Sequence, residues 1–561
     1  MSVDSKKIAA RQRAHLHGGQ VDGQDLKDLV EAALAWLRTN QQTVNALNVF
    51  PVPDGDTGTN MVLTMTNAWN EIANLGTTHA GQMAAAIAQG ALMGARGNSG
   101  VILSQLWRGF SRSLHNKEFI DGEALVAGLL EARDTAYKGV VRPVEGTILT
   151  VAKDMAAAGE AALAETKDPI EILRRCVAAA DVSVQHTPEL LPILKQAGVV
   201  DSGGKGLFFL MEGKLRYIDG LQLDAPVMQV QPLSAMNLEN AMDEVEAGQD
   251  YEVVVDFRPT AALDVESFYR HLEGMGTSIQ VGEGDGMYRM HIHVPLDKRY
   301  EPIDYVMSLG TITKIAMENL LAQMDEIGGA SHKPKLELAH IEAGHIAVVA
   351  VSPGHGLSRI FASLGVAALV EGGQTMNPST KDILDAFESL PTDNIIILPN
   401  NKNIILAAQQ AKEVTVKHVQ VVPSRTIPQG LAAMLQLQPD GSLAEVAAKM
   451  EKSLSGVTTG EITVATRSVE IDGVAVKEGQ VIALLDGKLA VAADNLEHGC
   501  MQLLEKAAAA DHELITLFFG QDLSHSEANR IADEIRTAYP SQEVELQEGG
   551  QPHYQLILSI E

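Results

Sequence analysis

The chain has 561 residues, is 45% hydrophobic, and carries a formal net charge of −29 from 43 basic and 72 acidic side chains. This length suits about three or four domains with sizeable cores. The acidic excess repels nucleic acids and anionic lipid surfaces, so neither is an expected partner. The sequence has two cysteines, no apolar signal core and no apolar run of about 18 residues, and therefore predicts a cytoplasmic protein without a disulfide framework or membrane insertion.

The first two hundred residues predict an all-helical domain. Apolar residues between 26 and 37 recur at helical spacing, and the alanine-rich stretches 83–93 and 151–166 favour helices. Short polar connections that contain glycine separate the helices, at 54–58, 94–100, 145–146 and 201–206. Such turns between long helices suggest a bundle whose loops gather at one end.

Two further domains follow. Strand patterns at 251–257 and 287–294, with helices expected at 264–275 and 305–319, predict a small α+β domain. Beyond it, β-branched runs alternate with helices, which is typical of a parallel α/β sheet; the runs are 341–351, 394–398 and 419–422, with further strands at 461–466, 481–485, 514–519 and 554–559. We expect domains at residues 1–222, 238–327 and 335–561.

An acidic turn in the first domain is the leading candidate for chemistry. Asp54 and Asp56 flank Gly55, and the prolines just before them keep the preceding helix from continuing. Carboxylate oxygens are hard ligands that suit Mg²⁺. A helix that begins at Thr59 or Asn60 would direct free N–H groups toward an anion. The same residues are also compatible with an ordinary solvated turn.

A second candidate is the glycine-rich loop 94–100, which leads into the apolar helix 101–110. Its small residues would expose N–H groups at a helix start, and Ser99 adds a hydroxyl donor. This arrangement is typical of phosphate-binding loops. The loop is not a Walker A sequence. Taken alone, it could equally be a tight turn between helices.

The motifs together resemble two known families. Residues 47–61, 94–100, 143–149 and 201–204 look like the nucleotide-binding domain of dihydroxyacetone kinases. The lead-in Asn-Val-Phe-Pro-Val-Pro before the acidic turn more particularly resembles the catalytic subunit of bacterial fatty acid kinase. That likeness continues through 373–380, 398–403 and 423–430, and so covers most of the chain.

The resemblance implies an N-terminal all-α helical barrel that binds ATP, a middle α+β domain, and a C-terminal α/β domain similar to the DegV-like fatty-acid-binding proteins. Asp54 and Asp56 would be catalytic and would hold Mg²⁺. Dihydroxyacetone kinases carry a third aspartate just before the turn, where Asn48 is the nearest candidate ligand here. The residues implied to line the nucleotide are Thr57, Gly58, Thr59, Asn60, Ser99, Gly100, Gly146, Asp201, Ser202 and Gly203.

The middle domain contains candidate ligands for a second metal site. His291 and His293 stand two positions apart on a predicted strand, so both imidazoles would project from one face. Related fatty acid kinases are similar in having such a pair, joined by a cysteine on an earlier strand, where Glu252 stands here. Two histidines and a glutamate can bind Zn²⁺. The alternative is a polar strand face without metal.

The function that the resemblance implies is ATP-dependent phosphorylation of a fatty acid presented by a separate DegV-family carrier, in a protein expected to be a homodimer. A carboxylate acceptor is already ionised at pH 7 and needs no strong base; the signature loops contain no histidine. One alternative is the nucleotide-binding subunit of a dihydroxyacetone kinase, which would end near residue 220. Another is a non-catalytic nucleotide-binding regulator, which the intact Asp54, Asp56 and Ser99 disfavour.

Overall fold

The computed structural model describes residues 19–47, 55–140, 142–223, 231–232, 251–261, 263–284, 287–319, 336–374, 376–466, 468–471 and 473–561. Two compact units make up the chain. Met1–Ala225 and Leu336–Glu561 form one unit, and Pro226–Lys335 forms the other. The helical and C-terminal domains thus share a unit, and the middle domain is described by itself.

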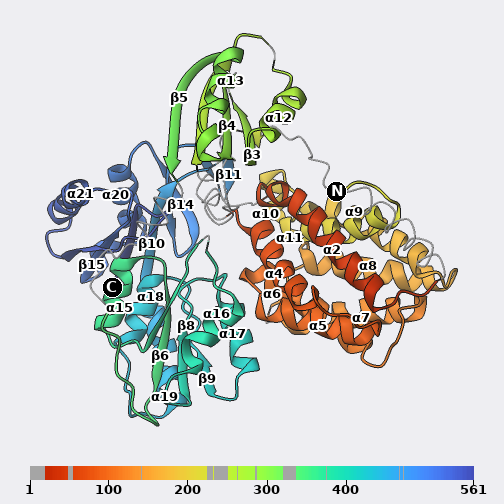
Figure 1. The fold of residues 1–561 in the computed structure, drawn as a ribbon. Coiled ribbons are helices and arrows are strands. Elements are labelled where there is room, and N and C mark those ends of the chain that lie inside the picture. Colours follow the sequence, from red (N-terminus) through yellow and green to blue (C-terminus); the bar gives the residue numbers. More distant parts are fainter. Residues whose placement is uncertain are drawn as a thin grey trace. The chain divides into compact units, whose positions relative to one another are not determined.

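The first domain is helical, as predicted, and its helices run from red to yellow in Figure 1. Neighbouring helices from α4 to α9 pack on one another along the chain, and α11 packs on both α2 and α8. The helices are α2 (Gly23–Thr39), α3 (Gln41–Asn45), α4 (Thr57–Ile72), α5 (Ala80–Met93), α6 (Gly97–Ser113), α7 (Gly122–Lys138), α8 (Ile148–Leu163), α9 (Pro169–Leu190), α10 (Pro192–Ala197) and α11 (Ser202–Ile218).

Helix α2 shows why these segments fold as they do. Asp22 begins the helix with a capping box, because its carboxylate accepts from the N–H of Gln24 and of Asp25. Leu26, Leu29 and other apolar residues of the predicted stripe are buried in the domain core. Burying such a side chain stabilises the fold by roughly 1.5–3 kcal/mol.

An apolar cavity of about 110 Å³ lies in the helical domain. Its lining includes Leu103, Trp107, Met155 and Leu207, with Lys214 among them. Burial lowers the pKa of Lys214 to about 8. Nothing in the sequence pattern distinguished this cavity from an ordinary packed core.

The middle domain is a five-stranded sheet with two helices, in the strand order β1-β3-β4-β2-β5. Helices α12 and α13 pack on one face, around a core that includes Phe257, Phe268 and Met290. The elements are β1 (Gln231–Pro232), β2 (Tyr251–Pro259), α12 (Val265–Glu273), β3 (Thr277–Gly284), β4 (Met287–Val294), η3 (Leu296–Lys298), α13 (Glu301–Leu309) and β5 (Gly310–Asn319).

The prediction of a helix over 305–319 was wrong. Helix α13 ends at Leu309, and the following residues form β5, which pairs with β2 along its length. Close pairing favours glycine at the junction, because a Cβ on Gly310 would lie 2.2 Å from the carbonyl oxygen of Arg258. The run after Gly310 contains Thr311, Ile312 and other β-branched residues that favour a strand.

The C-terminal domain begins with the predicted parallel sheet, in the order β7-β6-β8-β9. Its strands are continuous apolar runs such as Ile395 to Leu398, as expected for a sheet covered on both faces. This part comprises β6 (Ala347–Ser352), α15 (His355–Ser363), β7 (Ala368–Glu371), α16 (Thr380–Glu388), β8 (Asn394–Leu398), α17 (Ile405–Val414), β9 (His418–Val421), α18 (Ile427–Met434), α19 (Leu443–Ser453) and η4 (Leu454–Gly456).

A second, six-stranded sheet completes the C-terminal domain, in the order β14-β13-β10-β17-β15-β16. It is antiparallel except between β15 and β16, and a short hairpin, β11–β12, lies outside it. The elements are β10 (Thr458–Val464), β11 (Val469–Ile471), β12 (Val474–Val476), β13 (Val481–Leu485), β14 (Lys488–Ala493), α20 (Leu496–Lys506), η5 (Ala509–Asp511), β15 (Leu514–Phe519), α21 (His525–Ala538), β16 (Glu543–Glu548) and β17 (Leu556–Ile560).

The helical and C-terminal domains touch through α6 and α17. The side chain of Gln105 on α6 donates to that of Gln410 on α17, and both are buried. Within the described residues, no helix combines the length and apolar character that crossing a membrane requires.

Candidate functional site

The glycine-bearing turns of the helical domain stand at helix N-termini that contact one another. Helix α4 begins directly after Asp56, α6 after Arg96, and α11 after Asp201. The Ser202 hydroxyl donates to that of Thr57 over 3.2 Å, which joins the starts of α11 and α4. The turns that the sequence singled out therefore meet in space.

The start of α4 differs from the expectation of free N–H groups. The helix begins at Thr57, and the N–H groups of Gly58 and Thr59 both donate to the Asn45 side-chain oxygen, at 2.7 and 3.2 Å. Asn45 also donates to the Thr59 hydroxyl. These N–H groups therefore hold α4 on α3. An anion at this site has to be bound by other groups.

The start of α6 has the properties of an anion site. No described residue accepts a hydrogen bond from the backbone N–H of Gly97, Asn98 or Ser99. Gly97 has a φ of +57°, and a Cβ there would lie 2.7 Å from Nδ2 of Asn60. The loop thus needs glycine at this position, and its N–H groups are available to a phosphate.

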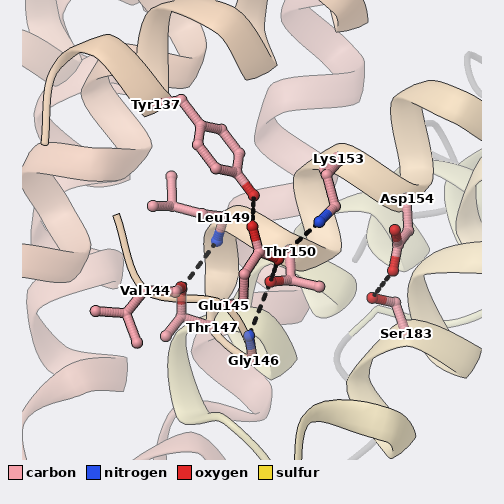
Figure 2. A network of polar contacts seen from close by, with 10 residues as sticks. All are labelled: Tyr137, Val144, Glu145, Gly146, Thr147, Leu149, Thr150, Lys153, Asp154 and Ser183. Carbon is pink, nitrogen blue, oxygen red and sulfur yellow. Dashed lines mark hydrogen bonds and ion pairs between the residues drawn. The ribbon is translucent and has the colours of Figure 1, made fainter. Parts of the chain in front are cut away.

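The loop before α8 is held by a network of polar contacts, which Figure 2 shows. Glu145 accepts hydrogen bonds from Tyr137, Thr150 and Lys153 at 3.0, 2.7 and 2.6 Å. The Lys153 ammonium and then the Thr150 hydroxyl lower the pKa of the Glu145 carboxyl. Gly146 has a φ of +80° and donates its N–H to the Thr150 hydroxyl, so this predicted site residue lies in a preformed turn.

Asp201 acts as a helix cap in this structure. Its carboxylate accepts from the N–H of Gly204 at 2.6 Å and also from that of Ile148 at the start of α8. Burial raises the pKa of Asp201 to about 6, against the lowering effect of these two hydrogen bonds. The residue therefore fixes the starts of α11 and α8 relative to one another.

Asp56 is the predicted metal ligand whose surroundings the structure describes. It is 8% exposed, and its carboxylate accepts a hydrogen bond from the Asn377 side chain of the C-terminal domain. The other predicted ligands of this site, Asp54 and Asn48, lie outside the described residues. A carboxylate beside amide oxygens and hydroxyls is a donor set that suits a hard cation such as Mg²⁺.

Supporting residues that the sequence analysis missed include Asn45, Thr64, Arg96 and Asn377. The Thr64 hydroxyl accepts from the N–H of Arg96 at 3.3 Å, which ties the loop before α6 to α4. In the sequence, the segment 373–380 that contains Asn377 stood out only as part of the likeness to fatty acid kinase. Its place beside Asp56 follows from a contact across 321 positions, which no local pattern encodes.

The middle domain brings Glu252, His291 and His293 together on the sheet face opposite its apolar core. One ligand atom from each lies within 4.8 Å of those of the others, and all three residues are buried. Glu252 stands opposite His293 in the β2–β4 register. Its carboxylate lies 2.9 Å from Nε2 of His291.

His293 marks this cluster as unusual. The residue is 0% exposed, and neither ring nitrogen has a hydrogen-bond partner among the described residues. Burial, then the neighbouring His291, lower the pKa of His293, which favours the neutral imidazole that a metal ligand requires. The Thr277 hydroxyl, opposite His293 in register, is likewise buried without a partner in the described residues.

Comparison with known proteins assigns each domain. Residues 51–216 match the DAK2 domain, residues 248–327 the middle domain of FakA-like fatty acid kinase proteins, and residues 347–561 their C-terminal domain. These matches define a multidomain, kinase-like protein.

The chain belongs to the FakA-like family of fatty acid kinase proteins. It is 39% identical over 552 residues to protein YloV of Bacillus subtilis, which covers 96% of this chain and 99% of that protein. An uncharacterized protein of Staphylococcus aureus strain USA300 is 36% identical over 550 residues, covering 97% and 100%. Among solved structures, the DegV family protein Cg2579 from Corynebacterium glutamicum matches with a TM-score of 0.31 at 18% identity, over 38% of this chain and 95% of that one.

Proposed function

We propose that the protein is an ATP-dependent kinase that phosphorylates the carboxylate of a fatty acid, presented by a separate DegV-family binding protein, to give an acyl phosphate for phospholipid synthesis. The observation that carries the proposal is that the starts of α4, α6 and α11 lie together: the Ser202 hydroxyl contacts that of Thr57, and a Cβ on Gly97 would lie 2.7 Å from Nδ2 of Asn60. The family to which the chain belongs supports the proposal as well.

Asp56, with Asp54 and Asn48 as further ligands, would hold Mg²⁺, which neutralises charge on the ATP phosphates. The N–H groups of Gly97 to Ser99 donate to a phosphate, and the Ser99 hydroxyl adds another donor. The rest of the nucleotide site is formed by Thr57, Ser202 and the turn at Gly146. The residues of the site thus supply positioning and charge stabilisation, which are the main demands of phosphoryl transfer.

The acceptor chemistry suits this set of residues. A fatty acid carboxylate oxygen attacks the γ-phosphorus, the bond from that phosphorus to the bridging oxygen breaks, and ADP leaves with the electron pair. Because the carboxylate is already ionised at pH 7, no proton has to be removed. The described signature loops accordingly supply donors and carboxylates, with no histidine among them.

The test is phosphate transfer from ATP to oleate and to dihydroxyacetone, each with its candidate carrier protein present. We expect acyl phosphate from oleate, and none when Asp54 or Asp56 is replaced with Ala. Transfer to dihydroxyacetone alone would identify a glycerone kinase subunit. Nucleotide binding without transfer to either acceptor would identify a non-catalytic regulator. Analytical ultracentrifugation of the same preparation tests the expected homodimer.

We also propose that Glu252, His291 and His293 bind a divalent ion such as Zn²⁺. The support is the clustering of the three ligand atoms and the burial of His293 without hydrogen-bond partners in the described residues. A carboxylate and two imidazoles form a known Zn²⁺ set.

Metal analysis by mass spectrometry after dialysis tests the zinc proposal. We expect about one zinc per chain in the wild type and a large loss in the Glu252→Gln variant, which keeps the size of the side chain but removes its charge. If the wild-type protein stayed metal-free after incubation with zinc, the three residues would form a polar strand face that binds no metal.

A further inference from the structure

The C-terminal domain reaches the candidate nucleotide site through the segment 376–380, which precedes α16. The Asn377 side chain donates from Nδ2 to the Asp56 carboxylate. Beside it, the Thr380 N–H donates to the carbonyl oxygen of Ala95 at 3.1 Å, and Ser379 forms a β-bridge with Arg96. The segment therefore lies against both the acidic turn and the loop before α6.

Arg96 fixes this segment from the side of the helical domain. Its guanidinium donates to the backbone oxygen of Asn377 at 2.9 Å and pairs with the Asp382 carboxylate at 3.2 Å. Asp382 in turn completes a capping box with Ser379 at the start of α16. The backbone that carries Asn377 is thus held in place by contacts that do not involve its own side chain.

The surroundings of the Asn377 side chain are typical of a residue with a role in binding. The residue is 2% exposed, and its Nδ2 has to face Asp56, because an ionised carboxylate only accepts hydrogen bonds. Its Oδ1 is buried and has no hydrogen-bond partner among the described residues. An unsatisfied buried oxygen is costly, so one that persists beside a carboxylate indicates an acceptor reserved for something that binds there.

The neighbourhood connects Asn377 with the phosphate loop as well. A Cβ on Gly97 would lie 2.7 Å from Nδ2 of Asn60 and 3.7 Å from Cγ of Asn377. Gly97 therefore lies close to both amides, at the point where the N–H groups of α6 are open. Asn377 is in contact range of both parts of the site, the carboxylate and the anion-binding loop.

We propose that Asn377 is a positioning residue of the metal–nucleotide site, supplied by the C-terminal domain. Its Nδ2 orients the Asp56 carboxylate toward the cation, and its Oδ1 accepts a hydrogen bond from a metal-bound water. Partners of this kind around a metal ligand typically contribute roughly 10–100-fold to metal affinity. The inference rests on the proposed function, since it assumes that Asp56 holds Mg²⁺.

The test measures ATP binding to the full-length chain by titration calorimetry, over a range of Mg²⁺ concentrations and in EDTA. In the Asn377→Ala variant we expect the Mg²⁺ concentration for half-maximal ATP binding to rise roughly tenfold or more, with little change in EDTA. A variant that only loosened the fold would weaken binding in both conditions.

The matched control is Asn403→Ala. Asn403 accepts a hydrogen bond from the Asn98 side chain at 3.2 Å, so its amide also joins the same two domains, but through a contact in which Asp56 takes no part. We expect it to leave the Mg²⁺ dependence unchanged. Equal shifts in both variants would show a general effect of domain contact and overturn the assignment.

Two other results would also overturn it. An Asn377→Ala variant with wild-type Mg²⁺ dependence would show that the amide does not serve the cation. Tighter Mg²⁺ binding in that variant would show that Asn377 blocks Asp56. Failure of the proposed function looks different, because the wild type would then show no Mg²⁺-dependent ATP binding at all.

Discussion

The loop cluster of the helical domain and the histidine cluster of the middle domain each centre on a buried carboxylate, yet they suit different ligands. Asp56 lies among helix N-termini, amides and hydroxyls, whereas Glu252 lies on a sheet beside two imidazoles. Oxygen donors favour Mg²⁺, and imidazole favours Zn²⁺. The two clusters show that the neighbours of a carboxylate, more than the carboxylate itself, decide which cation the site would suit.

The strongest test of this comparison is Asp56→Ala. We expect Mg²⁺-dependent ATP affinity, measured by titration calorimetry, to fall by more than about 100-fold, because a direct ligand contributes more than its hydrogen-bonded partners do. Zinc content should not change. The control is Asp121→Ala, which removes a carboxylate that caps α7 in the same domain. If both variants lost ATP affinity equally, the loss would reflect the fold and not a ligand.

The reciprocal test is His293→Ala. We expect it to remove most of the bound zinc, because it takes away one of three protein ligands, and to leave Mg²⁺-dependent ATP binding intact. His271, an exposed histidine stacked on Tyr305 in the same domain, provides the control through His271→Ala. If the His293→Ala variant retained its zinc, the histidine cluster would not be the zinc site.

A third prediction concerns Asp201, whose pKa burial raises to about 6 from 3.8. The folded state binds this proton more tightly than the unfolded state, so its stabilising effect is complete below pH 3.8 and is lost as the pH rises through about 6. The difference corresponds to about 3 kcal/mol. Asp201→Asn keeps an oxygen for capping and should lack this part of the pH dependence.

Urea unfolding followed by tryptophan fluorescence measures the Asp201 effect, since Trp36, Trp69 and Trp107 all lie in the helical domain. Parallel pH profiles for the variant and the wild type would contradict the prediction. The variant also sharpens the comparison: an unaltered Mg²⁺ dependence of ATP binding would mark Asp201 as a helix cap alone, and a changed one would place it at the nucleotide, as the family resemblance implies.

The smallest expected effect is that of Asp256→Asn. Asp256 shares a sheet face with the histidine cluster but pairs with Arg289 through contacts of 2.6 and 2.7 Å. Losing the charge should cost about 1–2 kcal/mol, visible as faster hydrogen exchange in β2 and β4, with zinc content unchanged. Loss of zinc in this variant would mean that the metal site extends beyond the three proposed ligands.

The outline of the fold could be predicted from local patterns. The apolar stripe of α2, the parallel strands β6, β8 and β9 and the polar turns between helices all follow from spacing and composition. The region after Leu309 could not, because a short apolar run fits a helix or a strand equally well until its partner is known. Pairing with β2 decided in favour of β5.

For the candidate sites, the sequence by itself determined which residues could carry chemistry. Alternation along a strand is enough to put His291 and His293 on one face, and the capping of helix starts is a local property. Tertiary structure decided the rest: Asn45 occupies the N–H groups expected to be free, Glu252 meets both imidazoles, and Asn377 reaches Asp56. Such contacts join segments that are distant along the chain, so they depend on how whole elements pack, which no local pattern records.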